Sequence, residues 1–351
     1  MAVIKGKKPH VLAVPYPAQG HVKPLMKLSR QIARHGIKVT FVNIECIHEK
    51  IVAAARMSDS EEEDDNIVLT SVPDGRGPDD DQNDTFKLLE SLRNTMPGFL
   101  TGLIESINRS NGDERVSCVI ADITIGWVLE TAEKMGAEAV LFSPPSAAAM
   151  AIILHIPRLL EEGNLDSNGL LPVGPLLDTN NPKSLSNSCN FHPEDASCLS
   201  WLHDKPPGSV VYVSFGSLAV LSQQQLDELA FGLELSGRDF LWVVRLDLAN
   251  WSRAVYPDGF LERVGELGKI VKWAPQESSF SSIYRLFSVA LWVEFDSGRT
   301  RHEIKTKIEM LFSDGRFKEN AMKVKEMCGK SVGEGGSSYK NFKTFVDHLS
   351  K

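Results

Sequence analysis

The sequence lacks the signatures of several protein classes. Its five cysteines are irregularly spaced and form no CxxC pair, and its nine histidines form neither an HExxH motif nor a Cys/His cluster. The cysteines therefore indicate reduced thiols in the cytoplasm. The histidines give no support to a metal site, and we expect none.

Charge and hydropathy exclude two further kinds of partner. The net charge is −8 and no basic cluster is present, so we do not expect nucleic-acid binding. No apolar run approaches the ~20 residues of a membrane helix, and the run at 11–14 is too short for a secretory leader. The 351 residues are 42% hydrophobic and 24% charged, which is typical of a globular chain with room for two domains. With no oligomer signal in the sequence, we expect a cytoplasmic monomer without a transmembrane segment.

Apolar and amphipathic runs alternate through the first 150 residues. We expect strands at 11–14, 39–44, 67–72, 116–121 and 138–142, and helices at 21–35, 86–107 and 126–135. Pro97 and Gly98 mark a point at which the second helix can break. Apolar strands that alternate with helices predict a parallel sheet covered on both faces.

The second half repeats this alternation. We expect strands at 209–215, 240–244 and 269–273, and helices at 222–235, 300–312, 318–328 and 338–349. Ser222 with Gln225, and Thr300 with Glu303, have the spacing of helix capping boxes. A segment rich in Asn, Ser and Pro at 177–195 joins the two α/β halves.

Two polar residues follow apolar strands of the first half. His21 comes just after the first strand, and Asp122 ends the strand at 116–121. Ligands of parallel sheets bind at the carboxyl ends of the strands, so His21 could take a proton there and Asp122 could orient its imidazole. The plainer interpretations are a surface histidine and a helix N-cap, and the sequence leaves both open.

Two candidate sites follow strands of the second half. The Gly216-Ser217 turn could bring backbone N–H groups and a hydroxyl to phosphate, although neither GxGxxG nor a Walker motif is present. Trp273 could stack on a planar base and Gln276 could bind ribose hydroxyls. Composition alone favours a buried tryptophan followed by a proline turn.

In their order along the chain, these segments resemble the plant family of UDP-dependent glycosyltransferases that act on small molecules. The resemblance covers most of the chain. It is carried by HVLAVPYPAQGHVKPLMKLSRQIARHGIKVTFVN, VSCVIADITIGWVLETAEKMGAEAVLF, LPVGPLL, SCLSWLHDKPPGSVVYVSFGSLAVLSQQQLDELAFGLELSGRDFLWVVR, YPDGFLERV, VKWAPQ, TRHEIKTKIEMLFSD and EGGSSYKNFKTFVDHLSK.

The resemblance implies a GT-B fold, in which two Rossmann-like domains with parallel sheets face a cleft. It implies His21 as general base, Asp122 as its orienting carboxylate, and transfer of a sugar, usually glucose, from a UDP-sugar to a hydroxyl of a small lipophilic acceptor. The reaction would invert the anomeric carbon and need no metal or cofactor, since the UDP-sugar is a co-substrate. The roles implied for the donor-site residues are a position near the diphosphate for Ser217, stacking on uracil for Trp273, backbone contacts to the base for Ala274 and ribose binding for Gln276.

The chain departs from this family pattern in two places. After Gln276 the family has a His-Cys-Gly-Trp-Asn-Ser segment for the diphosphate, a glutamate for ribose and an Asp-Gln pair for the sugar, whereas this chain reads ESSFSSIYRLFSVALWVEFDSG. A second gap is expected near 161–170, where several elements of the first domain are missing. Both gaps end in clean resumptions of the pattern, so we expect both domains to be incomplete.

These observations define four segments and three competing functions. The expected segments are an acceptor-binding domain at 1–177, a linker at 178–195, a UDP-sugar-binding domain at 196–336 and a C-terminal helix at 337–351. The first function is the glycosyltransferase. The second is an inactive truncated family member, or a gene-model or splice product, that at most binds acceptor. The family as a whole points to the first function, whereas the absent donor segment favours the second for this chain itself. The third, an NAD-dependent oxidoreductase, needs a glycine fingerprint after the first strand that residues 16–20 do not provide.

Overall fold

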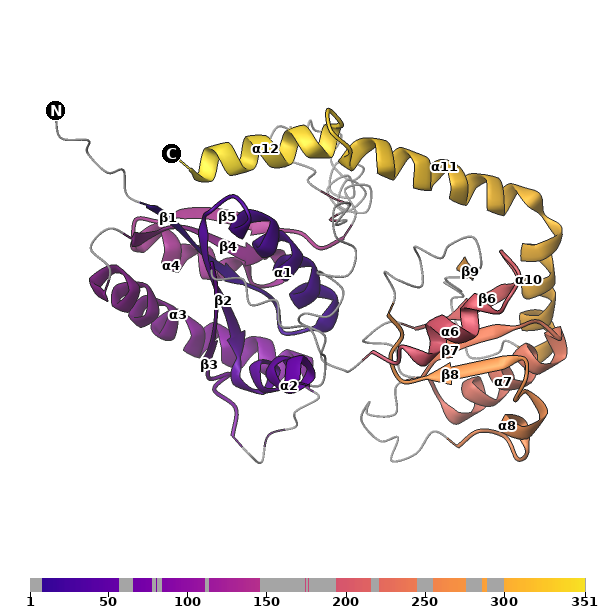
Figure 1. Cartoon of the computed structure of the whole chain (residues 1–351). Helices are drawn as coiled ribbons and strands as arrows, with labels where there is room; N and C mark the ends of the chain where they lie inside the picture. The colour runs from indigo at the N-terminus through magenta and orange to yellow at the C-terminus, as the bar shows by residue number, and fades with distance from the viewer. Residues whose placement is uncertain are drawn as a thin grey trace, which may run out of the picture. The chain divides into compact units, whose positions relative to one another are not determined.

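The computed structural model divides into two compact units. The first unit comprises Met1–Asn180, Ser188–Phe191 and Cys328–Lys351, and the second comprises Asn181–Asn187 and His192–Met327 (Figure 1). The structure describes residues 8–56, 66–77, 80, 84–110, 114–145, 174, 176, 194–215, 221–244, 255–275, 286–288 and 300–350.

The first unit is built on a five-stranded parallel sheet in the order β3-β2-β1-β4-β5. The strands are β1 Lys8–Val14, β2 Lys38–Ile44, β3 Ile67–Val72, β4 Glu114–Asp122 and β5 Glu138–Phe142. Residues 11–14 of β1 are fully buried, as expected for a central strand covered on both faces. The chain reverses its direction of travel across the sheet between β1 and β4, and such a switch point is where ligands bind in doubly wound sheets.

Helices cover this sheet. They are α1 Gln19–Ala33, α2 Glu45–Arg56, α3 Thr85–Ser110, the 3-10 helix η1 Ile123–Val128 and α4 Leu129–Lys134. The long helix expected at 86–107 is confirmed, and the break that Pro97 and Gly98 could have caused does not occur, because α3 continues through both residues. Its buried residues recur at helical spacing on both sides of Pro97, at Leu88, Leu92, Met96, Leu100 and Ile104. Packing of this apolar face outweighs the hydrogen bond that the proline removes.

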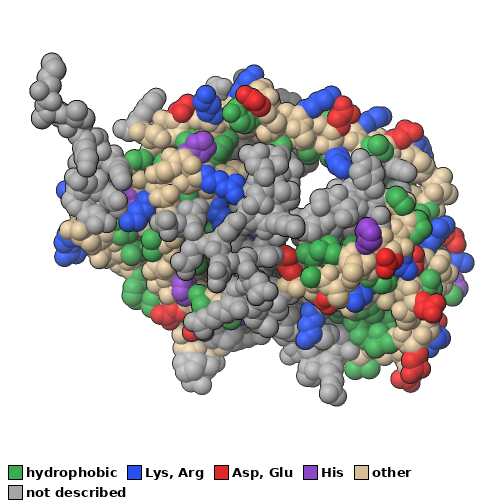
Figure 2. All heavy atoms as spheres, in the orientation of Figure 1, with side chains coloured by type: hydrophobic (Ala, Val, Ile, Leu, Met, Phe, Trp, Pro, Cys, Tyr) green, Lys and Arg blue, Asp and Glu red, His purple; other side chains and the backbone are tan. Residues whose placement is uncertain are grey.

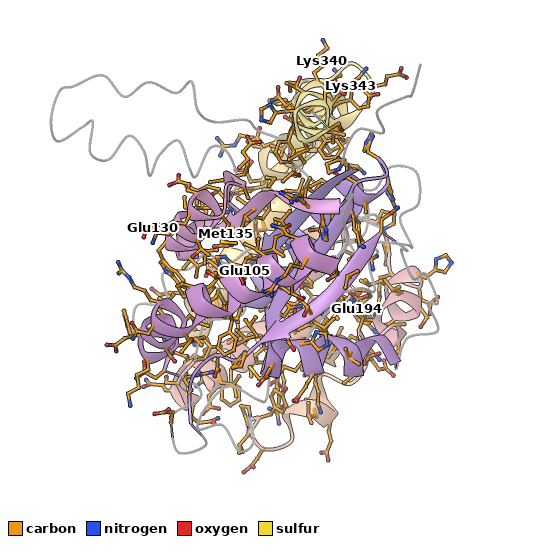
Figure 3. The ribbon with its side chains drawn as sticks, turned by 90° about the vertical axis from the view of Figure 1, so that its left-hand side faces the viewer. Glu105, Glu130, Met135, Glu194, Lys340 and Lys343 are labelled. Atoms are coloured by element: carbon orange, nitrogen blue, oxygen red, sulfur yellow. The ribbon has the colours of Figure 1, made fainter. Side chains whose placement is uncertain are left out.

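The last helix, α12 Ser337–Leu349, packs on the first unit although it follows the second unit in sequence. Val346 and Leu349 are buried in the core of the first unit. His348 Nε2 lies 2.6 Å from Glu138 Oε1. On the exposed side of α12, Lys340 and Lys343 project into solvent (Figure 3). The expected C-terminal helix is present as α12 and groups with the first compact unit.

The second unit contains a four-stranded parallel sheet in the order β8-β7-β6-β9. The strands are β6 Val210–Val213, β7 Phe240–Val243, β8 Gly268–Val271 and β9 Leu286–Ser288. This order repeats the β3-β2-β1-β4 order of the first unit. The short strand β9 was not expected from the sequence, yet it takes the place in this sheet that β4 takes in the first.

The helices of the second unit are α6 Ser197–His203, α7 Gln223–Ser236, α8 Phe260–Arg263 and α10 Arg301–Ser313. A further helix, α11 Gly315–Val332, contains the boundary between the two units. Trp242, Tyr256 and Phe260 pack in edge-on and stacked contacts within the core. No helix among the described residues is long and apolar enough to cross a membrane. On the face drawn in Figure 2, acidic and basic side chains of the described residues are intermingled.

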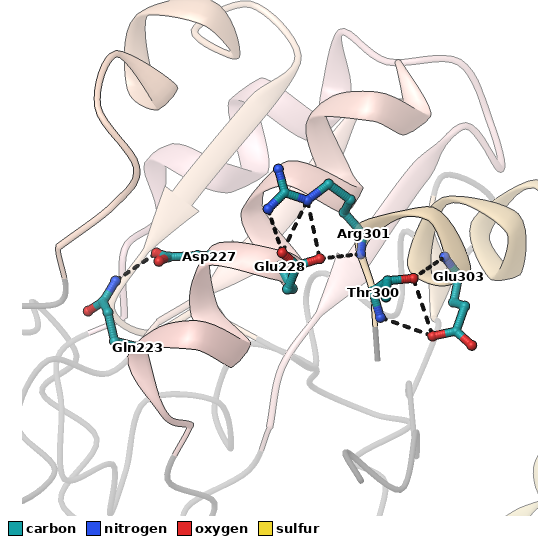
Figure 4. Close-up of polar contacts among 6 residues, drawn as sticks. All are labelled: Gln223, Asp227, Glu228, Thr300, Arg301 and Glu303. Atoms are coloured by element: carbon teal, nitrogen blue, oxygen red, sulfur yellow. Dashed lines mark hydrogen bonds and ion pairs between the residues drawn. The ribbon is translucent and has the colours of Figure 1, made fainter. Parts of the chain in front are cut away.

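Helices α7 and α10 are held together by polar and apolar contacts. Both expected capping boxes are confirmed, at Ser222 with Gln225 and at Thr300 with Glu303. The Arg301 guanidinium and backbone N–H donate to the Glu228 carboxylate (Figure 4), and the guanidinium holds the pKa of Glu228 below its usual range. Residue 300 is the point at which the family pattern resumes, so these contacts attach the resumed segment to α7.

Close approach of the same two helices makes Gly232 sensitive to substitution. A Cβ added at Gly232 would lie 2.6 Å from Ile304 Cγ2 and 2.7 Å from Ile304 Cβ. Gly232→Ala is expected to destabilise the protein by about 1 kcal/mol, because an overpacking cost of about 1–3 kcal/mol exceeds the helix gain of about 0.5–1 kcal/mol. Urea unfolding followed by tryptophan fluorescence measures the difference.

The control for this prediction is Gly102→Ala in α3. A Cβ at Gly102 meets no atom within 4 Å, so only the helix gain applies and the variant is expected to be slightly more stable than the original chain. A Gly232→Ala variant as stable as the Gly102→Ala variant would contradict the packing described for α7 and α10.

Candidate active site

His21 lies at the point where β1 gives way to α1. The strand ends at Val14, the chain turns through Pro15 and Pro17, and α1 begins at Gln19. Two backbone hydrogen bonds fix this turn, from Ala18 N–H to the Tyr16 carbonyl at 2.7 Å and from His21 N–H to the Ala18 carbonyl at 2.9 Å. The imidazole therefore starts from the first turn of a helix at the carboxyl edge of the sheet, where the sequence predicted it.

Asp122 is the last residue of β4 and its side chain is completely buried. His21 Nδ1 lies 2.8 Å from Asp122 Oδ2, and Asp122 Oδ1 accepts a 2.9 Å hydrogen bond from the Thr124 backbone N–H. Asp122 is therefore both the N-cap of η1 and the partner of His21, so the two interpretations left open by the sequence hold together. A buried carboxylate needs such donors, and with both in place each oxygen of Asp122 has a partner.

This geometry selects one form of the histidine. A carboxylate accepts hydrogen bonds, so Nδ1 of a neutral His21 carries the proton and Nε2 keeps its lone pair. The His21 side chain is 26% exposed, whereas that of Asp122 is not exposed at all. The exposed imidazole can therefore accept a proton from outside while its partner remains sequestered, which is the arrangement of a general base and its orienting group.

Three further residues of this edge escaped the sequence analysis. The Tyr16 ring contacts the His21 ring edge-on, with centroids 5.2 Å apart, and burial together with Asp122 raises the pKa of its phenol.

An ion pair follows β3 at the same edge of the sheet. Arg76 Nη2 donates to Asp74 Oδ2 at 2.8 Å, and both side chains are largely buried. The loop that carries the pair is tied to α3 by a 2.7 Å hydrogen bond from Ser91 Oγ to the Asp74 carbonyl. In the sequence, Tyr16 stands out only because two prolines flank it, and Asp74 and Arg76 only as charged residues of one loop.

Two of the four candidate donor residues, Trp273 and Ala274, lie among the residues that the structure describes. Ser217 and Gln276 lie outside the described residues. Trp273 follows β8 and is half-buried, and its carbonyl accepts a 2.9 Å hydrogen bond from the Asp195 N–H. Ala274 is 2% exposed and packs in a core cluster with Cys198, Leu202, Val210, Tyr212, Leu241 and Val271. Trp273 and Ala274 thus occupy a fixed position at the carboxyl edge of the second sheet.

Among the residues that the structure describes, no group of three or more His, Cys, Asp or Glu side chains could hold a metal ion. The cysteines described there, Cys46, Cys118, Cys198 and Cys328, are free thiols.

Comparison with known proteins identifies the family. Residues 8–68 match the family described as glycosyltransferase, N-terminal domain. The chain is 31% identical to UDP-glycosyltransferase 83A1 of Arabidopsis thaliana, with 97% of each chain covered. The chain belongs to the plant UDP-glycosyltransferase family. It is also 26% identical to 7-deoxyloganetin glucosyltransferase of Catharanthus roseus, over 98% of this chain and 97% of that one.

Solved structures place this family member in the GT-B fold class. Os79 from O. sativa, in complex with U2F and trichothecene, superimposes with a TM-score of 0.75 at 20% identity and covers 97% of this chain and 100% of its own. UDP-glucose: anthocyanidin 3-O-glucosyltransferase in complex with UDP gives 0.74 at 19% identity, with 99% and 100% covered. The expected α/β class, with Rossmann-like units on parallel sheets, is confirmed.

The length of the alignment shows that the family member is shorter than its relative. The alignment with the Arabidopsis protein runs over 451 positions, whereas this chain has 351 residues. At least about 100 positions of the alignment therefore have no residue of this chain. Since both chains are covered almost from end to end, those positions fall inside the chain.

Proposed function

We propose that this glycosyltransferase family member uses His21 to deprotonate a hydroxyl of a small lipophilic acceptor and transfers a sugar to that oxygen from a UDP-sugar. The observation that carries the proposal is the 2.8 Å contact between His21 Nδ1 and the fully buried Asp122 carboxylate at the switch point of the first sheet. The names of the relatives support the donor, and one of them names a glucosyltransferase, which supports glucose.

The chemical step follows from the tautomer of His21, which carries its proton on Nδ1 and its free lone pair on Nε2. Nε2 of His21 takes the acceptor's hydroxyl proton, and the acceptor oxygen attacks the anomeric carbon of the sugar. As the new carbon–oxygen bond forms, the bond from the same carbon to the diphosphate breaks and UDP leaves with the electron pair. A single displacement of this kind inverts the anomeric carbon. Asp122 stabilises the imidazolium that forms, and we propose that the step needs no metal ion or cofactor.

Binding of the two substrates is divided between the units. We assign the acceptor to the carboxyl edge of the first sheet, because His21 lies there. We assign the nucleotide to the corresponding edge of the second sheet, with Trp273 stacking on uracil and Ala274 presenting backbone groups to it. Ser217 and Gln276 would complete this site at the diphosphate and the ribose. We further expect a monomer that works in the cytoplasm.

A transfer assay tests this proposal. The full chain is incubated with UDP-glucose and a panel of phenols and aliphatic alcohols, and glycosides are detected by mass spectrometry. The original chain is expected to form product, and His21→Ala to lower the rate about 10²- to 10⁴-fold, the usual contribution of general base catalysis. His203→Ala, at an exposed histidine that ends α6, is the matched control and should leave the rate unchanged.

One observation favours a second candidate function, acceptor binding without turnover. At least about 100 positions of the relative's alignment have no residue here, and the sequence after Gln276 departs from the family pattern at the expected diphosphate segment. Acceptor binding by the folded chain, combined with no product from any acceptor, would favour this second candidate. Product formed at an equal rate by the original chain and by His21→Ala would contradict the assignment of His21.

A further inference from the structure

Tyr16 is buried beside the His21–Asp122 pair, and neither the family comparison nor the sequence assigns it a role. The residue is 6% exposed, so its ring lies in the core of the first unit. The Tyr16 and His21 rings meet at an interplanar angle of 74° with their centroids 5.2 Å apart. This T-shaped arrangement is one of the two that aromatic rings favour.

The hydrogen bond to Asp122 alone does not fix the imidazole. Asp122 holds only Nδ1, so the ring could still swing about the line from Nδ1 to Oδ2 and carry Nε2 away from an acceptor. A second contact on the ring removes that freedom. Tyr16 makes this contact from the strand side of the turn, whereas His21 belongs to the helix side.

The backbone around Tyr16 is unusually restricted. Pro15 and Pro17 flank it, each with a fixed φ, and the residue before a proline is confined to extended conformations. The Tyr16 carbonyl accepts a 2.7 Å hydrogen bond from the Ala18 N–H. This restricted backbone fixes the position from which the Tyr16 side chain starts, so its ring can hold a neighbouring ring in place.

The surroundings of the phenol keep it neutral. Burial is the main cause that raises the pKa of Tyr16, and the Asp122 carboxylate raises it further, whereas Arg76 acts in the opposite direction. A neutral phenol adds no second negative charge beside the Asp122 carboxylate. Tyr16 is thus suited to shape the pair without taking part in proton transfer.

We propose that Tyr16 is a positioning residue, whose ring holds the His21 imidazole so that Nδ1 stays on Asp122 and Nε2 faces the acceptor. This inference rests on the proposed role of His21 as general base. It is the ring that acts, through its edge-on contact, and not the phenol hydroxyl. The chain therefore needs an aromatic residue at this turn to keep its base aligned.

Nuclear magnetic resonance tests this inference without requiring turnover. The histidines are labelled with ¹⁵N, and the His21 signals are assigned by their loss in His21→Gln. In the original chain we expect one tautomer, protonated at Nδ1, and cross-relaxation between the ring protons of Tyr16 and His21. Absence of that cross-relaxation would overturn the inference in the unmodified protein, whatever the stability of the Tyr16 variants.

Two substitutions separate the ring from the hydroxyl. Tyr16→Phe keeps the ring and is expected to retain the Nδ1-protonated tautomer of His21. Tyr16→Leu removes the ring and is expected to raise the Nε2-protonated fraction several-fold, and to lower kcat about tenfold without changing KM for the UDP-sugar. A leucine variant with unaltered ¹⁵N shifts, or a phenylalanine variant that behaves like leucine, would overturn the assignment to the ring. If no chain shows transfer, the proposed reaction fails while the nitrogen shifts still decide the role of Tyr16.

Discussion

Replacing Asp122 with asparagine is expected to lower the rate of sugar transfer about 10²- to 10⁴-fold while leaving the fold intact. The amide oxygen can still accept from the Thr124 N–H, so the N-cap of η1 survives. The amide nitrogen, however, donates to His21 Nδ1 where the carboxylate accepts from it. The neutral imidazole then carries its proton on Nε2 and has no lone pair to offer the acceptor hydroxyl.

This prediction is measured as a ratio of single-turnover rates at saturating UDP-sugar, together with the ¹⁵N shifts of His21. The shifts are expected to show the opposite tautomer from that of the original chain. Asp84→Asn is the matched control, because Asp84 Oδ1 accepts from the N–H groups of Phe86 and Lys87 at the start of α3 and has no histidine partner in the described hydrogen bonds. An asparagine at 122 that transfers sugar as fast as the control would show that His21 does not depend on a fixed tautomer.

The His21–Asp122 pair could be predicted because its two halves follow from local patterns. Each residue comes directly after an apolar strand, and parallel strands place such residues at one edge of the sheet whatever their separation in sequence. The capping boxes at Ser222 and Thr300 were predictable for the same reason, since their partners lie three residues away. Local pattern and topology together were enough for this half of the site.

Contacts over long sequence separations were not predictable in this way. The packing of Val346 and Leu349 on the first unit brings together residues hundreds of positions apart. The apolar pattern of α12 predicts a buried face but does not indicate which part of the chain covers it. The continuity of α3 through Pro97 was missed because packing of the whole helix face overrides a local rule. Strand β9 was missed because three residues give too short a pattern to recognise.

The second unit contains the edge at which we propose that UDP binds. Its sheet has the same strand order as the first, so the edge between β6 and β9 is the counterpart of the edge that carries Asp122. Ser288, the last residue of β9, is followed by the apolar run 289–293. The segment that the family resemblance implies here would supply a helix N-terminus and polar side chains to the diphosphate. The side chains of the run 289–293 carry no positive charge, and the Trp292 indole is their one hydrogen-bond donor.

UDP is therefore expected to bind this chain at least about 100-fold more weakly than it binds the Arabidopsis relative. A hydrogen bond to a charged group contributes about 1.5–3 kcal/mol, so loss of two phosphate contacts removes at least about 3 kcal/mol. Each 1.4 kcal/mol corresponds to a factor of ten in Kd. Isothermal titration calorimetry on both proteins under the same buffer and salt conditions gives the ratio.

Two variants show where the remaining affinity comes from. Trp273→Ala is expected to abolish the residual binding, because we propose that its indole stacks on uracil. A chimera in which the relative's segment replaces residues 277–299 is expected to recover most of the lost affinity, since Thr300 and the contacts of Arg301 with Glu228 still anchor the helix that follows. Equal affinity of this chain and the relative would show that the diphosphate is held by residues other than the missing segment. Weak binding that the chimera restores would place a defect of this family member in its donor site, in a different unit from the His21–Asp122 pair.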